Sequence, residues 1–182
     1  MKIKKINFCV LLLLIASIFT ISSCEKVLNA TFTKTFSNIT FEIDTTSAVG
    51  NVTFAGENIN TDISNFAASN NFNLNRIKSA KIKLCNINIL DSSLTNPVTF
   101  GMIDYVSAKL TGVGLDTLEI GSRNITPGSN LTSITLDLMN VDVLPYIKAD
   151  SFNYIISGST NAPIPHKVPM SANLSFEIVA GL

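Results

Sequence analysis

The chain contains 182 residues, and its 13 lysines and arginines are balanced by 13 aspartates and glutamates. The charges are spread along the sequence, which argues against nucleic acid as a partner, because binding phosphates needs a clustered basic face. A single histidine, His166, excludes metal sites built from several histidines. The length suits one domain with its own core.

The first 23 residues have the pattern of an export signal. Lys2, Lys4 and Lys5 precede an apolar run over residues 8–19, which is followed by two serines. A charged start, a short apolar stretch and a cleavage site of small residues are typical of a signal peptide. The apolar run has about a dozen residues, whereas a membrane-spanning helix needs roughly 20.

The four residues Ile21-Ser22-Ser23-Cys24 resemble the lipobox of a bacterial lipoprotein, in which an aliphatic residue and two small residues precede a cysteine. The resemblance implies cleavage before Cys24 and attachment of lipid to its sulfur, so that the protein contacts the membrane through this lipid. It also implies a place in the cell envelope at the outer membrane, on either the periplasmic or the surface face. The alternatives are an ordinary secretory signal with an unrelated cysteine and an uncleaved anchor.

Removal of residues 1–23 changes the charge and the cysteine count. Three of the 13 basic residues are lost and all 13 acidic residues remain, which leaves a net charge near −3. Cys9 leaves with the signal and Cys24 is expected to carry lipid, so Cys85 alone remains and no internal disulfide forms. Cys85 is predicted to be a small buried side chain. Residues 24–31 are expected to form a short tether, and residues 32–182 a single domain.

Alternation of apolar and polar residues predicts strands through most of this domain. The predicted strands cover residues 31–43, 77–90, 104–110, 115–120, 131–138, 151–159 and 168–180, with a short strand or loop at 49–54. Turn-forming residues predict connections at 91–97, 112–114, 122–130 and 161–167. The apolar positions change parity near Asn38 and again at Cys85, and each change indicates a β-bulge.

One short helix is predicted after residue 60. Thr61 or Asp62 can cap it, and Ile63, Phe66 and Ala67 have helical spacing. Residues 139–148 have mixed spacing and predict at most a single helical turn, interrupted by Pro145.

Many strands and one short helix predict a mainly β fold, an antiparallel β-sandwich or a partly open barrel. The arrangement is similar to small β-sandwich envelope lipoproteins of the Bacteroidetes type. That resemblance rests on the anchor, the size and the strand-rich texture of Asn, Thr and Ser.

The sequence contains no motif typical of catalysis, metal binding or cofactor binding. His166 lies between Pro165 and Lys167 and is predicted to be an exposed loop residue. Asp137 and Asp142 flank a predicted turn, and the other candidates for a calcium site are Asp44, Asp62 and Asp116, but they lack the spacing of an EF-hand. No catalytic, metal-binding or cofactor-binding residue is therefore assigned.

Two short segments resemble the O-glycosylation motif of exported Bacteroidetes proteins, which is Asp followed by Ser or Thr and an apolar residue. They are Asp44-Thr45-Thr46 and Asp116-Thr117-Leu118. The candidate sites are Thr45 and Thr117, and ordinary turn chemistry is the alternative for both.

We therefore expect a lipid-anchored envelope protein with a non-catalytic role in binding or structure, and with an envelope protein as a possible partner. The alternative is a carrier that holds an apolar ligand or lipid in a cavity of the sandwich or barrel. A hydrolase built from scattered carboxylates and His166 is a third, weaker interpretation.

The lipobox gives a direct prediction. Replacing Cys24 with alanine is expected to abolish incorporation of labelled palmitate, because the alanine side chain has no sulfur to accept the lipid. Palmitate incorporation that continued in the Cys24→Ala protein would show that the cysteine is not the anchor.

Overall fold

The alternating residues at the end of the chain form β10 (Val168–Gly181), which pairs antiparallel with one strand on each side. This pairing is seen in a computed structural model that describes residues 29–46, 49–54 and 58–181. The expected signal and Cys24 lie outside the described residues. The first sheet has the order β1-β10-β4-β7 and consists of β1 (Asn29–Ile43), β10, β4 (Ile77–Ile89) and β7 (Ser133–Thr135).

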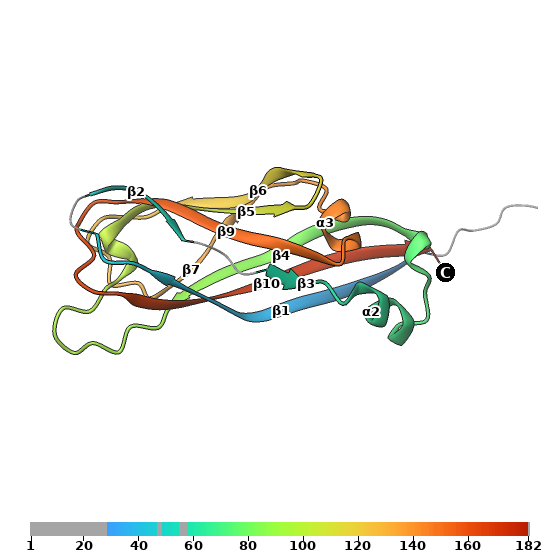
Figure 1. Ribbon diagram of the computed structural model, residues 1–182, viewed down its shortest axis with the longest axis horizontal. Coiled ribbons are helices and arrows are strands. Elements are labelled where there is room, and N and C mark those ends of the chain that lie inside the picture. Colours follow the sequence, from blue (N-terminus) through green and yellow to red (C-terminus); the bar gives the residue numbers. More distant parts are fainter. Residues whose placement is uncertain (1–28, 47–48, 55–57, 182) are drawn as a thin grey trace, which may run out of the picture.

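The second sheet packs against the first and completes a β-sandwich (Figure 1). Its order is β2-β9-β5-β6-β8, and the short β3 also pairs with β9. Its strands are β2 (Gly50–Phe54), β3 (Asn58–Asn60), β5 (Ile103–Gly112), β6 (Leu115–Asn124), β8 (Asp137–Leu138) and β9 (Ser151–Thr160). All pairings in both sheets are antiparallel. The mainly β prediction is confirmed, and the two sheets form a sandwich rather than a closed barrel.

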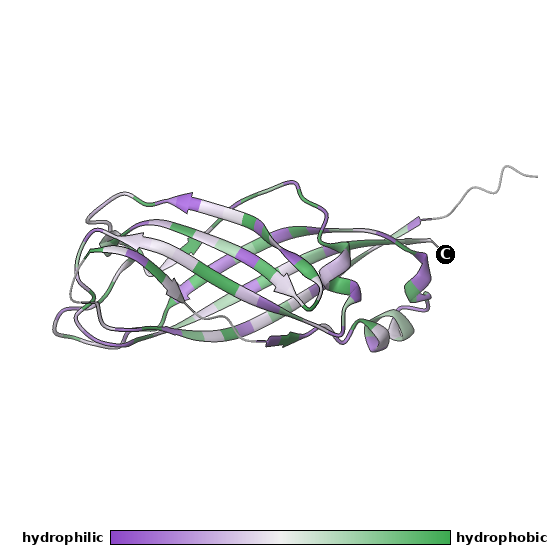
Figure 2. Cartoon of the chain, turned by 45° about the horizontal axis from the view of Figure 1, so that its top comes forward, coloured by the Kyte–Doolittle hydropathy of each residue, from purple (hydrophilic) through white to green (hydrophobic). Residues whose placement is uncertain are grey.

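The core lies between the sheets and is built from apolar side chains of the long strands, with burial at every second residue along β9. Figure 2 shows the resulting alternation of hydrophobic and hydrophilic residues along the strands. Phe152 on β9 and Phe176 on β10 meet edge to face, with ring centroids 6.2 Å apart. Phe36 on β1 makes similar edge-to-face contacts with both rings, at 5.6 and 5.7 Å. These aromatic pairs join the two sheets, and such contacts add to the free energy gained by burying the rings.

Both predicted bulges are present. In β1 the register shifts between Phe36 and Ile39, and Asn38 adopts a left-handed conformation with φ of 57°. Its backbone N–H is held by the side-chain oxygen of Asn173 at 3.0 Å. In β4 the pairing with β10 shifts between Leu84 and Ile82, which leaves one extra residue. Each bulge lets apolar side chains of opposite parity face the same core.

The helices are short. The predicted helix is α2 (Ile63–Ser69), which buries Ile63 and Ala67. Asp62 occupies the cap position, but its side chain makes no capping hydrogen bond. The part of the chain that the structure describes also contains the helix α3 (Leu144–Lys148) and the 3-10 turns η1 (Leu74–Arg76) and η2 (Phe100–Met102).

Several predicted element bounds, and the predicted effect of Pro145, differ from the structure. Residues 131–138 form two short strands, β7 and β8, which belong to different sheets. β6 continues to Asn124, into the predicted loop at 122–130. Pro145 does not interrupt a helix but occupies the first turn of α3, where its missing N–H costs nothing.

The first strand also begins earlier than predicted, at Asn29 rather than residue 31. β1 pairs only with β10 among the described strands, so it is an edge strand. Lys34 lies on the same side of β1 as Phe32 and Phe36, with Nζ 5.0 Å from the ring centroid of Phe66 on α2. Desolvation lowers the pKa of Lys34, against the raising effect of the Asp62 charge. An inward-facing lysine discourages pairing of this edge with another strand.

Gly158 offers a test of the packing of the second sheet. Its backbone crosses so close to β5 that an added Cβ would lie 2.3 Å from the carbonyl oxygen of Tyr105. We expect Gly158→Ala to lower the free energy of unfolding by about 1–3 kcal/mol, because the strands must move apart. Urea denaturation measures this, with the exposed Asn51→Ala on neighbouring β2 as the control. Equal stability of the two variants would contradict the close approach.

Candidate functional site

Polar contacts gather at the end of the sandwich where β1 finishes and β10 begins. This distal end comprises residues 43–46 at and after the end of β1, residues 90–98 after β4, and residues 161–169 before and within β10. The backbone ties them together: the N–H of Leu90 donates to the carbonyl of Pro169 at 2.8 Å. The Thr46 N–H donates to the Ile164 carbonyl at 3.2 Å, and the Ile164 N–H donates to the Thr46 hydroxyl at 3.0 Å.

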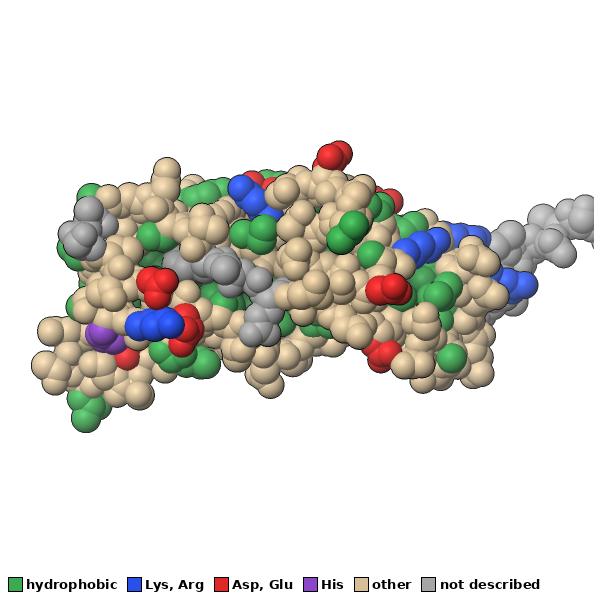
Figure 3. All heavy atoms as spheres, in the orientation of Figure 1, with side chains coloured by type: hydrophobic (Ala, Val, Ile, Leu, Met, Phe, Trp, Pro, Cys, Tyr) green, Lys and Arg blue, Asp and Glu red, His purple; other side chains and the backbone are tan. Residues whose placement is uncertain are grey.

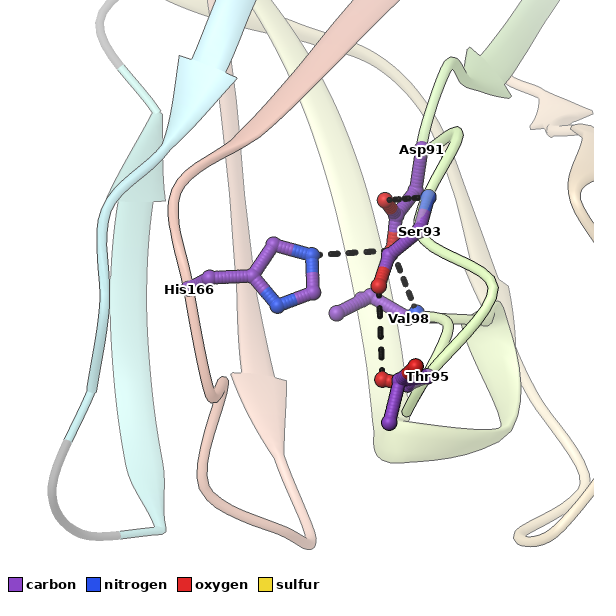
Figure 4. A network of polar contacts seen from close by, with 5 residues as sticks. All are labelled: Asp91, Ser93, Thr95, Val98 and His166. Atoms are coloured by element: carbon purple, nitrogen blue, oxygen red, sulfur yellow. Dashed lines mark hydrogen bonds and ion pairs between the residues drawn. The ribbon is translucent and has the colours of Figure 1, made fainter.

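Asp91 is the centre of this end of the molecule (Figure 4). Its Oδ1 accepts a hydrogen bond from the Ser93 N–H at 2.8 Å, and its Oδ2 accepts one from the Val98 N–H at 2.7 Å. His166 Nε2 lies 3.0 Å from the same Oδ2. The Asp91 side chain is only 7% exposed, whereas that of His166 is 37% exposed. One carboxylate therefore shapes the loop after β4 and fastens it to the Pro-rich connection.

The same contacts stabilise the charged form of Asp91. The Val98 N–H makes the largest contribution to lowering the pKa of this carboxyl, and burial opposes it. The Ser93 N–H and the imidazole of His166 lower the pKa of Asp91 further. Hydrogen bonds donated to a carboxylate favour its ionised form in this way.

The pair of Asp91 and His166 resembles two members of a catalytic triad, but no nucleophile is hydrogen-bonded to the imidazole among the described residues. The Ser93 hydroxyl donates to the carbonyl of Thr95 at 3.3 Å, and no described hydroxyl or thiol is hydrogen-bonded to the imidazole. A nucleophile has to lie within hydrogen-bond reach of its base. The contacts that the described residues make here are those of a structural clamp between two loops.

Cys85 is the described free thiol of the chain. It is fully buried in the core, and its sulfur lies 3.2 Å from the hydroxyl of Tyr154. Burial raises the pKa of the Cys85 thiol to about 12, although the hydrogen bond with Tyr154 acts in the opposite direction. The prediction of a small buried side chain is confirmed, and a thiol with so high a pKa is a poor nucleophile at neutral pH.

A pocket of about 580 Å³ opens beside this clamp, between the edges of the two sheets. Buried Phe41, Ile43 and Met170 contribute its apolar part. The residues lining the pocket are Thr40, Phe41, Glu42, Ile43, Asp44, Thr46, Val52, Thr53, Leu90, Lys167, Pro169 and Met170. Its size falls in the range of ligand-binding pockets.

The rim of the pocket is charged. Lys167 forms an ion pair with Glu42, and its Nζ lies 4.0 Å from the Asp44 carboxylate. The hydrogen bond and charge of Glu42 raise the pKa of Lys167, and Asp44 adds a smaller effect. Figure 3 shows acidic, basic and histidine side chains close together at this end. Two carboxylates against one ammonium leave the rim with a surplus negative charge, which favours a cationic or polar ligand over an apolar one.

The acidic residues considered for calcium do not gather. Asp142 accepts a hydrogen bond from the Leu144 N–H at the start of α3, and Asp62 accepts one from the Asn65 amide. Asp137 lies on β8 and Asp116 on β6. Among the described residues no group of three or more acidic, histidine or cysteine side chains is close enough to hold a metal ion.

The two candidate glycosylation sites are both exposed. Thr45 follows β1 and Thr117 lies on β6. An exposed hydroxyl is what a modifying enzyme needs, so glycosylation at both positions stays a prediction.

Comparison with known proteins adds little to this description. No family model matches the sequence, and no curated protein matches it. One solved structure with a similar arrangement is titled "Structure of infectious bursal disease virus Gx strain". It has 14% sequence identity and a TM-score of 0.38, and the match covers 85% of this chain and 32% of that one. A similarity at this level supports no conclusion about function. In the part of the chain that the structure describes, no helix has the length and apolarity needed to cross a membrane.

The lowered pKa of Asp91 predicts how the stability of the protein depends on pH. Because its pKa is lower in the folded protein than the ordinary 3.8, its contribution to stability is present above that value. The contribution disappears as the pH falls through the lowered pKa. We expect Asp91→Asn to lower the free energy of unfolding at pH 7 by about 1–3 kcal/mol, since an amide accepts fewer of these hydrogen bonds.

Urea denaturation at several pH values measures this, with Asp116→Asn on the exposed face of β6 as the control. The difference in free energy of unfolding between the Asp91→Asn variant and the unmodified protein should become smaller below about pH 4. A difference in free energy of unfolding that stayed constant from pH 7 to pH 3 would contradict the stabilising role of the ionised Asp91 carboxylate.

Proposed function

We propose that this protein is a lipid-anchored component of the cell envelope, held at the outer membrane by Cys24, that binds a partner with its distal end and catalyses no reaction. The observation that carries the proposal is the position of the pocket relative to the start of β1. Asn29 and Ile43 are the two ends of that strand, and the pocket lies at the Ile43 end. At about 3.3 Å per residue, β1 separates them by roughly 45 Å.

This separation suits a protein that is held at one end and binds at the other. A lipid on Cys24 precedes Asn29 by five residues, so the opposite end would project away from the membrane. Figure 1 shows that the long strands β1, β4 and β10 all run along this axis. The loops that carry the pocket rim and the Asp91 clamp are then the most accessible part of the molecule to a partner.

The distal end also exposes apolar side chains. Leu94 is 100% exposed at the tip of the loop after β4, and Leu90 at the start of that loop is 49% exposed. Leu90 lines the pocket itself. Protein interfaces combine an apolar centre with a polar rim. Apolar side chains beside a rim with surplus negative charge fit a protein segment that carries apolar and basic side chains.

Photo-crosslinking in intact cells tests the proposal. A photoreactive residue at position 94 is expected to capture a defined envelope protein, whereas the same residue at Val113 is not. Val113 is equally exposed but lies in the turn between β5 and β6, away from the distal end. Equal products at the two positions, or none at position 94, would contradict binding through the distal end.

The charge of the rim can be tested in the same experiment. The double variant Glu42→Gln/Asp44→Asn is expected to reduce the position 94 product several-fold, because it removes both carboxylates that would contact a basic partner. Asp116→Asn/Asp150→Asn is the matched control, since both of these carboxylates are exposed and neither lines the pocket. An equal loss in both double variants would rule out a specific role for the rim.

A further inference from the structure

The end of the sandwich opposite the pocket has a different surface, which we call the anchor end. It comprises residues 29–31 of β1, residues 70–78 with η1 and the start of β4, and residues 179–181 of β10. The register places Asn29 opposite Gly181, so both ends of the described chain lie here (Figure 1). Lys78 belongs to the same surface, because its Nζ donates to the side-chain oxygen of Asn29 at 2.7 Å.

The exposed charges of the anchor end are positive. Arg76 at the end of η1 and Lys78 at the start of β4 are exposed, and neither forms an ion pair with a described residue. The sequence from 63 to 80 contains no aspartate or glutamate. Figure 3 shows basic side chains toward this tip and the acidic ones set back from it. The remaining exposed side chains of the 70–78 segment include the uncharged Asn71, Asn73 and Asn75.

The length of chain before β1 limits what this surface can face. Asn29 follows Cys24 by five positions, and a fully extended chain of five residue steps reaches about 18 Å at most. A lipid on Cys24 would therefore keep Arg76 and Lys78 close to the membrane surface. This step rests on the proposed lipid anchor.

We propose that the anchor end docks on the headgroups of anionic phospholipids, with Arg76 and Lys78 as the cations that contact the phosphates. A basic residue near such a surface strengthens association about five-fold, so two strengthen it roughly 30-fold. That is too little to hold a free domain. It is enough to orient a tethered one, because the lipid already supplies a high effective concentration. Docking at this end would point the pocket and the Asp91 clamp directly away from the membrane.

The experiment uses the full lipidated protein on vesicles of phosphatidylcholine, with or without phosphatidylglycerol. A fluorescent donor is attached at Asn75→Cys or, for comparison, at Leu94→Cys, and acceptors label the lipid headgroups. Buried Cys85 does not compete for the dye. We expect energy transfer from position 75 to rise when phosphatidylglycerol is present and to fall again in high salt, because salt screens exposed charges. Energy transfer from position 94 should fall under the conditions that raise it from position 75, because docking points this end away from the membrane.

Two double variants separate this docking from simple tethering. Arg76→Gln/Lys78→Gln is expected to remove the increase caused by phosphatidylglycerol. Lys109→Gln/Arg123→Gln also removes one arginine and one lysine, but on β5 and β6, outside both the anchor end and the pocket, and should retain the increase. Transfer from position 75 that is equal on both kinds of vesicle would overturn the docking surface. Failure of the protein to float with the vesicles would overturn the lipid anchor, and with it this inference.

Discussion

The pairing of β10 with β1 on one side and β4 on the other is the interaction on which the rest of the sandwich depends. β10 is buried along its inner face, where Leu174, Phe176 and Ile178 are fully inaccessible. Its partners come from the first half of the domain, with Asn29 opposite Gly181. The first sheet is therefore complete only when both ends of the domain are in place. Such long-range pairing is slow to form, because the entropy of closing the chain is lost before the contacts stabilise it.

The faces of the strands could be predicted from the sequence because side chains alternate with a period of two. The same argument located the two bulges, since a change of parity has to be absorbed within a strand if both halves bury their apolar residues. In β1 the shift falls between Phe36 and Ile39, where Asn38 adopts the left-handed conformation that asparagine tolerates well. Burial of Cys85 follows from the second change of parity, in β4.

The partners of strands and loops could not be predicted in this way. Ile134 and Leu136 are both buried, as their alternation indicates, yet β7 pairs with β4 and β8 with β6. Alternation reports which face is apolar and not which sheet a segment joins. The contact of His166 with Asp91 spans 75 residues and depends on how two loops meet. Nothing in the sequence around Asp91 or His166 indicates that the two loops meet, apart from the fact that both side chains can ionise.

The two ends of the sandwich differ in a way that the strands themselves do not require. Core packing determines the side chains that point inward. The charged side chains at the two ends are exposed, so packing does not determine their charge: they are Arg76 and Lys78 at one end and Glu42 and Asp44 at the other. The open edge of β1 is protected by the inward Lys34, whose Nζ packs over aromatic rings and discourages pairing with another chain. A sandwich protected along this edge and charged differently at its ends is suited to hold two surfaces apart. Under the proposed function, the long strands would separate a membrane contact at one end from a binding site at the other.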